Sequence, residues 1–370
     1  MPSSRKKKIF TIVAAVVLLI AGAALALHFS SGTDAGARSQ LLRLVPADST
    51  AVIFLDFDQF RTSPFLAKFY AWAPHPAEDS EYSQFVRDTG FSYERDLKRT
   101  AIAVSNHGAI TDLLAIVDGK FDRKKIEAFL NRNGKSTQQG KWKIYLLNAS
   151  VGDRPLSLTF LSDSRIAVTD SGNLADALSR ASSDAGHGEW NERFERLAGA
   201  PLFAVIRQDP ALQEAMNAAA PGGFRSPALS TLFNQLQWIS IAGKPDGDIL
   251  RVVGDGECQS DRTTSQLRDF LQGVLLLAQN GLNDPKLRQQ MNPEERDAYL
   301  EILKNADIQK IDRGEWKSVR VALSVTPRFL DLATLPSPVA PPDKAPDKAP
   351  TPQPAVKKKP AAKAQSQKQP

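Results

Sequence analysis

An uncharged apolar run from Ile9 to Leu27 is the strongest constraint on this 370-residue chain, because its 19 residues are enough to cross a membrane as a helix. At about 1.5 Å per residue the run would span roughly 28 Å, close to the ~30 Å hydrocarbon core of a bilayer. The basic cluster Arg5 to Lys8 precedes the run and is expected to stay in the cytoplasm by the positive-inside rule. We therefore expect a single-pass protein of the cytoplasmic (inner) membrane, with its N-terminus inside and the bulk of the chain periplasmic or extracytoplasmic.

This apolar segment has two interpretations. One is an uncleaved transmembrane signal anchor, 9–27, after a cytoplasmic leader, 1–8. The other is a cleaved signal peptide, since Ala24, Leu25 and Ala26 fit the small-residue cleavage rule. The apolar core of a secretory signal usually has about 7–15 residues, so the greater length favours the anchor. The segment has no cysteine, which excludes a lipoprotein anchor. Both interpretations place the rest of the chain outside the cytoplasm.

The chain changes character again over 336–370. This segment holds ten of the 24 prolines and almost no large apolar residue. Because proline interrupts helices and strand ladders alike, we expect a disordered tail rich in Pro, Lys and Ala. Its lysines, among them Lys357, Lys358 and Lys359, could contact anionic envelope polymers or envelope proteins. The alternative is a solvated spacer.

The basic charge of the chain lies outside its expected folded part. The full sequence has 47 Lys and Arg against 41 Asp and Glu, a net charge of +6. The leader carries +4 and the tail +5, so residues 9–335 carry −3. This distribution removes the case for a nucleic-acid-binding domain. The single cysteine excludes a disulfide scaffold and a zinc site built on cysteines.

Short apolar runs, turn signals and capped helices alternate between the two ends, which predicts an α+β fold with mainly antiparallel sheets and packed helices. After a linker at 28–39, a first α+β unit is expected over 40–185. It opens with a buried strand at Thr50–Phe57 and includes a helix capped by Asp122. A helix at Leu174–Ala181 closes it.

A second α+β unit, expected over 186–335, repeats this order. Lys244–Gly247 is a strong turn signal for a hairpin. Thr263 and Gln266 resemble a capping box at the start of a long helix. A further helix capped by Asn292 would be an insertion in this unit.

Short sequence matches support a tandem duplication of the two units. Gly140–Lys143 reads Gly-Lys-Trp-Lys, and Gly314–Lys317 reads Gly-Glu-Trp-Lys. Each would open a late strand. The alternative is one large, irregular α+β domain.

Several short strings also match the opening of a known group of proteins: Val45-Pro46-Ala47-Asp48, Phe54-Leu55-Asp56, Ser63-Pro64-Phe65, Thr89-Gly90-Phe91 and Asp96-Leu97. Over this first part of the exported chain, the sequence resembles an uncharacterised bacterial family of single-pass membrane-anchored extracytoplasmic proteins. The resemblance implies the same location and architecture. It implies no catalytic residues.

One motif could carry chemistry. Asp56-Phe57-Asp58 follows an apolar strand, as in phosphohydrolases of the haloacid-dehalogenase type, where one carboxylate attacks phosphorus and the other moves a proton. Asp255 follows a later strand and would be the metal ligand. Against this alternative, the fold of those enzymes needs parallel strands, whereas the hairpin before Asp255 predicts antiparallel ones.

The remaining chemical signals are weaker. Cys258 has no partner thiol, and the four histidines show no metal-ligand spacing. Trp142 and Trp316 could be aromatic platforms for sugar or lipid, or could anchor strands in a core.

We therefore expect a membrane-anchored extracytoplasmic binding or scaffolding protein of the bacterial cell envelope, without cofactor or metal. The alternatives are the phosphohydrolase and a carrier of lipid or another apolar ligand.

Overall fold

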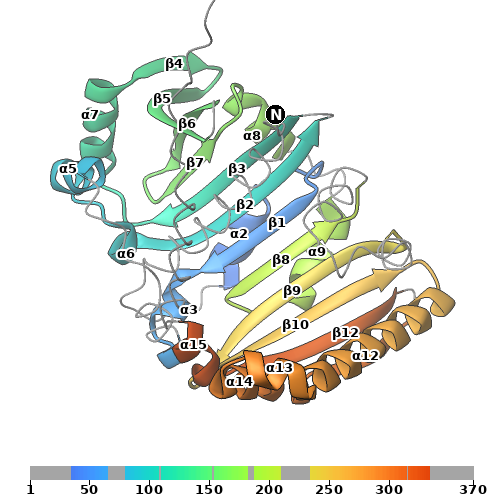
Figure 1. Ribbon diagram of the computed structural model, residues 1–370. Helices are drawn as coiled ribbons and strands as arrows, with labels where there is room; N and C mark the ends of the chain where they lie inside the picture. The colour runs from blue at the N-terminus through green and yellow to red at the C-terminus, as the bar shows by residue number, and fades with distance from the viewer. Residues whose placement is uncertain are drawn as a thin grey trace, which may run out of the picture. The chain divides into compact units, whose positions relative to one another are not determined.

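The computed structural model describes residues 35–65, 80–107, 110–151, 154–181, 187–209, 234–314 and 316–333. Over these residues the protein is α+β, with a large antiparallel sheet and helices on both of its faces (Figure 1). Within the described ranges, no helix has the length and apolar character needed to cross a membrane. The expected span Ile9–Leu27 and the tail 336–370 lie outside these ranges and stay predictions.

The sheet has 12 strands in the order β11-β12-β10-β9-β8-β1-β2-β3-β7-β6-β5-β4, and its neighbouring strands are antiparallel. The strands are β1 (Ala51–Asp56), β2 (Leu97–His107), β3 (Ile110–Gly119), β4 (Lys135–Gln139), β5 (Trp142–Val151), β6 (Arg154–Ser162), β7 (Arg165–Thr169), β8 (Leu202–Arg207), β9 (Leu236–Asp246), β10 (Ile249–Cys258), β11 (Asp307–Arg313) and β12 (Trp316–Val325).

The sheet extends outward in both directions from the central β1–β8 pair. On one side β2 and β3 follow β1, and on the other side β9 and β10 follow β8. In each half a later strand, β7 or β12, returns to pair with the third strand, β3 or β10. Strands of both expected units therefore share one continuous sheet. The tandem duplication stays a prediction.

The described helices are α2 (Ala35–Leu42), α3 (Phe57–Arg61), α5 (Ser80–Thr89), α6 (Tyr93–Asp96), α7 (Arg123–Asn133), α8 (Leu174–Ala181), α9 (His187–Arg196), α12 (Asp261–Asn283), α13 (Pro285–Gln290), α14 (Pro293–Lys304) and α15 (Pro327–Ala333). One face of the sheet, called here the covered face, packs against α2, α8 and α9. On the opposite face, α7 packs near one edge of the sheet, and α12 and α14 pack near the other edge.

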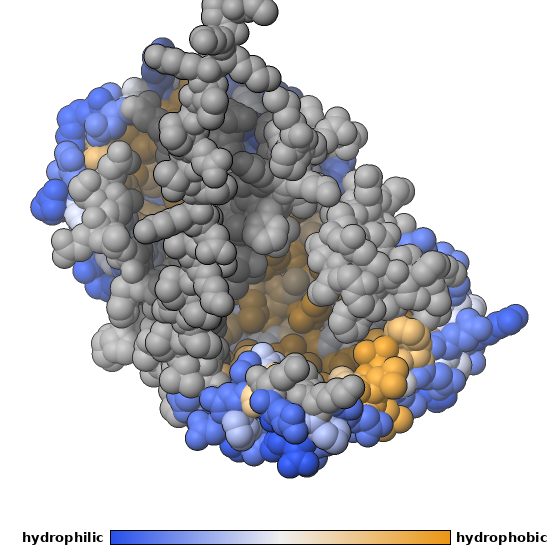
Figure 2. Space-filling view, viewed as in Figure 1, coloured by the Kyte–Doolittle hydropathy of each residue, from blue (hydrophilic) through white to orange (hydrophobic). Residues whose placement is uncertain are grey.

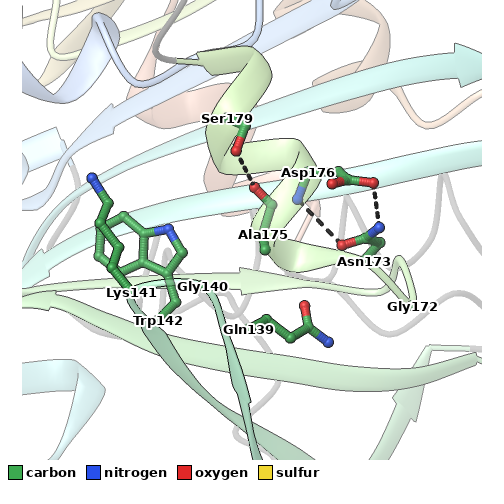
Figure 3. A pocket seen from close by; sticks show the side chains of 9 residues that line it. All are labelled: Gln139, Gly140, Lys141, Trp142, Gly172, Asn173, Ala175, Asp176 and Ser179. Carbon is green, nitrogen blue, oxygen red and sulfur yellow. Dashed lines mark hydrogen bonds between the residues drawn. The ribbon is translucent and has the colours of Figure 1, made fainter.

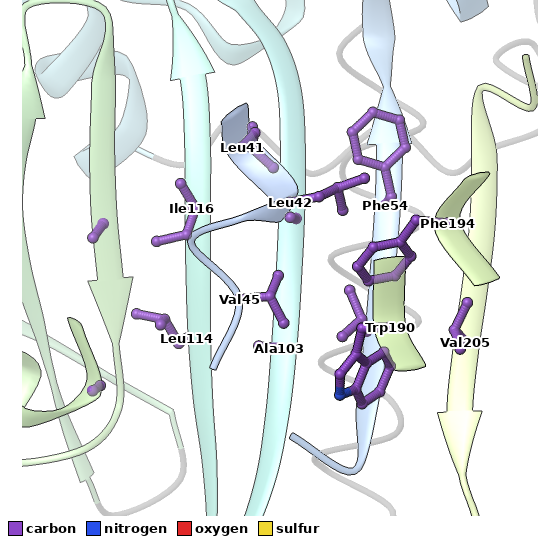
Figure 4. Close-up of a cluster of buried hydrophobic side chains, with 14 of the residues drawn as sticks. Leu41, Leu42, Val45, Phe54, Ala103, Leu114, Ile116, Trp190, Phe194 and Val205 are labelled. Carbon is purple, nitrogen blue, oxygen red and sulfur yellow. The ribbon is translucent and has the colours of Figure 1, made fainter. Parts of the chain in front are cut away.

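The main hydrophobic core lies on the covered face (Figure 4). Phe54 of β1 and Phe203 of β8 stack with ring centroids 5.0 Å apart, so the two halves of the sheet meet in this core. Trp190 of α9 meets Trp238 of β9 edge to face at 4.9 Å. Leu41 of α2 is fully buried here. Burial of side chains this large stabilises each by about 1.5–3 kcal/mol, which fixes the central strands in place.

A buried ion network holds α9 to β10. The Glu257 carboxylate accepts hydrogen bonds from both Arg193 and Arg196. The Arg193 guanidinium also lies between two indoles, 3.9 Å from the centroid of Trp238 and 4.6 Å from that of Trp316. Burial lowers the pKa of Arg193, while Glu257 opposes that change. Trp316 is half-buried, and its ring packs against this guanidinium.

Several local predictions are confirmed. β1 lies within the expected first strand and is one residue shorter at each end, and α8 has the predicted bounds. At the start of α7 the Asp122 side chain accepts the amide of Lys125 at 3.1 Å. The β9–β10 hairpin closes where expected, with Gly247 in the left-handed region at φ 63°. The helix at Asn292 is α14, capped through the amide of Glu294 at 2.9 Å.

Other details differ from the predictions. The long helix α12 begins earlier than the supposed capping box at Thr263, because Ser260 is its N-cap and accepts the Thr263 amide at 3.2 Å. The expected linker 28–39 overlaps α2, which begins at Ala35. Tyr145 of β5 is buried against α7. Two edge strands, β4 and β11, were not predicted, because their sequences are mostly polar.

Candidate functional site

The structure places Asp56 in a structural role. It is the last residue of β1 and the N-cap of α3, where its Oδ1 accepts the amide of Gln59 at 3.1 Å. Its Oδ2 accepts a hydrogen bond from Nε of Arg99 at 3.0 Å, and both side chains are buried. Each oxygen of this carboxylate therefore accepts a structural hydrogen bond, one in the helix cap and one from a buried arginine.

Asp58 and Asp255 are also paired with arginines. Asp58 meets Arg61 at 2.9 Å, and burial raises the pKa of Asp58 while Arg61 opposes that rise. Asp255 receives two hydrogen bonds of 2.7 Å from Arg320 of β12. The strand order places β10 three strands away from β1, a separation of about 14 Å. The structure therefore does not bring Asp255 to the other two carboxylates.

Two further features of the hydrolase alternative are missing. β1 pairs antiparallel with both β2 and β8, so the parallel sheet that this chemistry uses is absent around Asp56. The described ranges also hold no cluster of His, Cys, Asp or Glu able to bind a metal ion. Cys258 is buried and burial raises its pKa, which keeps the thiol protonated and unreactive.

A different site emerges on the face of the sheet opposite the covered face, called here the open face. β1 and β8 are apolar on both faces. Their covered-face side chains Val52, Phe54, Phe203 and Val205 are 0% exposed. On the open face of the same strands Ala51, Ile53, Leu202, Ala204 and Ile206 are half-buried, whereas Leu55 is 7% exposed. Both faces of these two strands are therefore apolar, but the side chains on the covered face are more deeply buried.

Strand register defines a central row across the open face. Pairing connects directly opposite residues, which share a face of the sheet. The row runs through Val168, Ala115, Ile102, Ile53, Ala204, Ile241, Gly254, Val321 and Ile308. Ile102 is buried, whereas Ile241 of β9 is 42% exposed. Nine adjacent strands thus present an uncharged strip about 38 Å long, at about 4.8 Å per strand step.

The rows on either side of this strip are equally apolar between β3 and β12. One contains Leu113, Val104, Ala51, Ile206, Ile239, Gly256 and Val319. The other contains Val117, Thr100, Leu55, Leu202, Gly243, Val252 and Leu323. Thr100 has the one polar side chain in these three rows over seven strands. No charged side chain and no general acid or base lies among the described residues of these three rows, so the rows favour contact with apolar matter.

Helices line the open face rather than fill it. α7 packs against β5 and β6 through Ile126 and Leu130. α12 packs against β9 and β12 through Leu267. α3 packs against the end of β1 through Phe57 and Phe60. In Figure 2 the middle of this face is hollowed, and hydrophobic side chains are visible at its floor.

The middle of the floor has little cover from the described elements. Ala115, Ile102, Ile53, Ala204 and Ile241 belong to none of the four hydrophobic clusters that the described residues form. Figure 2 also shows a hydrophobic patch over α12, where Leu276 and Leu277 are exposed. Exposed apolar side chains that gather on one face are typical of a binding surface, and on this face they include Ile241 of β9.

The comparisons with known proteins concern the fold alone. No family model and no curated protein matches the chain. Crystal form III of TP0453 is similar in structure, with 10% identity and a TM-score of 0.43 over 82% of this chain and 99% of that one. Crystal form I is 8% identical, with a TM-score of 0.43 over 83% of this chain and 98% of that one. Crystal form IV is 7% identical, with a TM-score of 0.44 over 79% of this chain and 94% of that one. Scores of this size carry no argument about the function of this chain.

The open face was not predicted from sequence. Apolar residues on both faces of β1 indicated a strand buried on both sides. That pattern cannot distinguish a face covered by the chain itself from a face that receives a ligand. One signal in the sequence could have indicated the open face. It is the pair of unbroken apolar runs in β1 and β8, each beside strands of a hairpin.

Proposed function

We propose that this protein is a membrane-anchored extracytoplasmic binding protein of the bacterial cell envelope, and that its ligand is an apolar molecule of the lipid class held on the open face. The observation that supports this most is the uncharged, concave central row, which is less buried than the covered face of the same strands. Apolar surface gains about 25 cal/mol for each Å² removed from water, so such a row favours a hydrocarbon ligand.

The expected membrane anchor supports the same proposal. Eight residue steps connect Leu27, the end of the predicted span, to Ala35, where α2 begins. At about 3.4 Å per step, this connection reaches at most about 27 Å. A folded unit held so close to a bilayer would meet lipid at high local concentration. In this proposal Lys357, Lys358 and Lys359 add contacts to anionic polymers or proteins of the envelope.

Lipid extraction from the full-length protein tests the proposal. The protein is purified in a detergent-free polymer nanodisc, and bound lipid is compared by mass spectrometry with that of an empty nanodisc preparation. Binding of a fluorescent fatty acid is then measured with Ile241→Asp. Its control is Lys244→Asp, an exposed position on the opposite face of the same strand.

We expect Ile241→Asp to weaken binding of the fluorescent fatty acid at least threefold, and Lys244→Asp to leave it unchanged. Covering the exposed 42% of Ile241 accounts for about 0.6–1.2 kcal/mol, or roughly three- to eightfold in affinity, before the cost of burying a carboxylate. Equal affinity in the two variants, with no lipid enriched in the purified protein, would contradict the proposal.

A further inference from the structure

A second candidate site lies away from the open face, in a cleft of about 480 Å³ (Figure 3). One wall is the turn between β4 and β5, with Gln139, Lys141 and Trp142. The other wall is the start of α8, with Asn173 and Asp176. Because α8 packs on the covered face, this cleft shares no lining residue with the open face.

Local geometry holds the polar wall in place. The side-chain oxygen of Asn173 accepts the amide of Asp176 at 3.2 Å, so Asn173 caps the helix. Its amide nitrogen donates to the Asp176 carboxylate. Ser179, one turn further on, donates to the carbonyl of Ala175 at 2.8 Å. These hydrogen bonds favour one arrangement of the amide and the carboxylate, and both groups are exposed to solvent.

The opposite wall presents an aromatic ring beside a polar group. Gly140 adopts φ 57°, a left-handed conformation that glycine tolerates and that turns the chain sharply before Trp142. Trp142 is half-buried and packs partly against the main core, which restrains its ring. The side-chain oxygen of Gln139 is buried and has no hydrogen-bond partner among the described residues. This acceptor is unused where it lies, and rotation of the Gln139 side chain would present it to a donor on a ligand.

The charges in the cleft argue against an anionic ligand. The Asp176 carboxylate faces the cleft, and the ammonium of Lys141 already lies 4.7 Å from the centroid of the Trp142 ring. Because one negative and one positive group line the same space, a phosphate or carboxylate gains no net attraction. Lys141 is exposed, so its side chain can move aside and free the indole face.

From this arrangement we propose that the cleft binds a sugar ring of a neutral or N-acetylated oligosaccharide. A pyranose has an apolar C–H face that packs on an indole and a rim of hydroxyl groups that both donate and accept hydrogen bonds. Trp142 supplies the flat apolar surface, Asn173 and Asp176 supply amide and carboxylate groups across the cleft, and Gln139 supplies an amide on the same wall as the indole. This assignment is independent of the proposed lipid ligand.

Ligand-observed NMR with the full-length protein tests the proposal. The probes are the trimer of N-acetylglucosamine and maltotriose, with adenosine as a flat aromatic competitor. Trp142→Leu keeps apolar volume but removes the flat ring, and Trp142→Phe restores a ring. Gln139→Ala removes the unpaired oxygen at a strand edge. Tyr299→Ala, an exposed aromatic on α14, is the matched control.

We expect one of the two saccharides to bind with millimolar affinity or better. Trp142→Leu should weaken binding about tenfold, Trp142→Phe should recover most of it, and Gln139→Ala should weaken it about threefold. Tyr299→Ala should leave it unchanged. Thermal unfolding of each variant checks that the fold is intact. The proposal is overturned if neither saccharide binds, if Trp142→Leu binds as well as the unchanged protein, or if adenosine binds at the cleft and displaces the sugar.

Discussion

Replacing Glu257 by Gln should destabilise this protein more than any other isosteric change of a charged residue in the described sheet. The carboxylate is buried on β10 and neutralises Arg193 and Arg196 of α9. Arg193 is fully buried between Trp238 and Trp316, so it cannot turn toward water when its counter-charge is lost. Glu257→Gln keeps the shape of the side chain and removes only the charge.

The magnitude follows from the cost of an unpaired buried charge. Removing one partner of a buried ion pair costs about 3–5 kcal/mol. For a folded unit of this size, each kcal/mol lowers the melting temperature by about 2 °C, so a fall of roughly 6–10 °C is expected. Replacing Arg193 and Glu257 together by Met should recover most of the loss, because well-packed apolar residues then fill the space without a stranded charge.

Thermal unfolding of the full-length protein in mild detergent, followed by circular dichroism, measures these shifts. The control is Asp246→Asn, which breaks the ion pair with Arg251 on the same hairpin, where both side chains are more than half exposed. Exposed pairs are worth about 0–1 kcal/mol, so this control should shift the melting temperature by 2 °C or less. A shift for Glu257→Gln no larger than that of the control would refute the reasoning.

Three other outcomes are expected. Burial raises the pKa of Cys258, so iodoacetamide at pH 8 should label it far more slowly in the native protein than in urea; equal rates would contradict its burial. Ser260→Ala removes the cap of α12 and should cost about 1 kcal/mol in urea unfolding, whereas Thr263→Ala, which keeps the capping oxygen, should cost less. A periplasmic reporter fused after Pro370 should be active; activity of a cytoplasmic reporter there would overturn the expected topology.

Local sequence signals predicted most of the secondary structure of the sheet. An apolar run marked β1, and the turn ending at Gly247 marked the β9–β10 hairpin. These elements were predictable because strand period and turn chemistry depend on neighbouring residues only. The edge strand β11 was not predicted, because Ile308 and Ile311 are three positions apart among charged and amide side chains and so do not show the period of a strand.

The candidate sites were less predictable, because they depend on partners distant in sequence. Asp56-Phe57-Asp58 resembled a catalytic motif, but Arg99, which pairs with Asp56, comes 43 positions later. Nothing in the local sequence indicated that pairing. Trp142 was recognised as a possible platform, yet the wall of Asn173 and Asp176 that faces it is set by the packing of α8. In both cases tertiary contacts decided the role of the residue.

The central β1–β8 pair also has a consequence for the nascent chain. Leu55 pairs with Leu202, 147 positions further along the chain. At about 5–20 residues per second, a ribosome needs roughly 7–30 s to synthesise that interval. During this time one edge of β1, with its row of unpaired backbone amides and carbonyls, can pair with other chains. The β1–β8 pairing at the centre of the sheet therefore cannot form until β8 has been synthesised, so this edge of β1 stays unpaired for that interval.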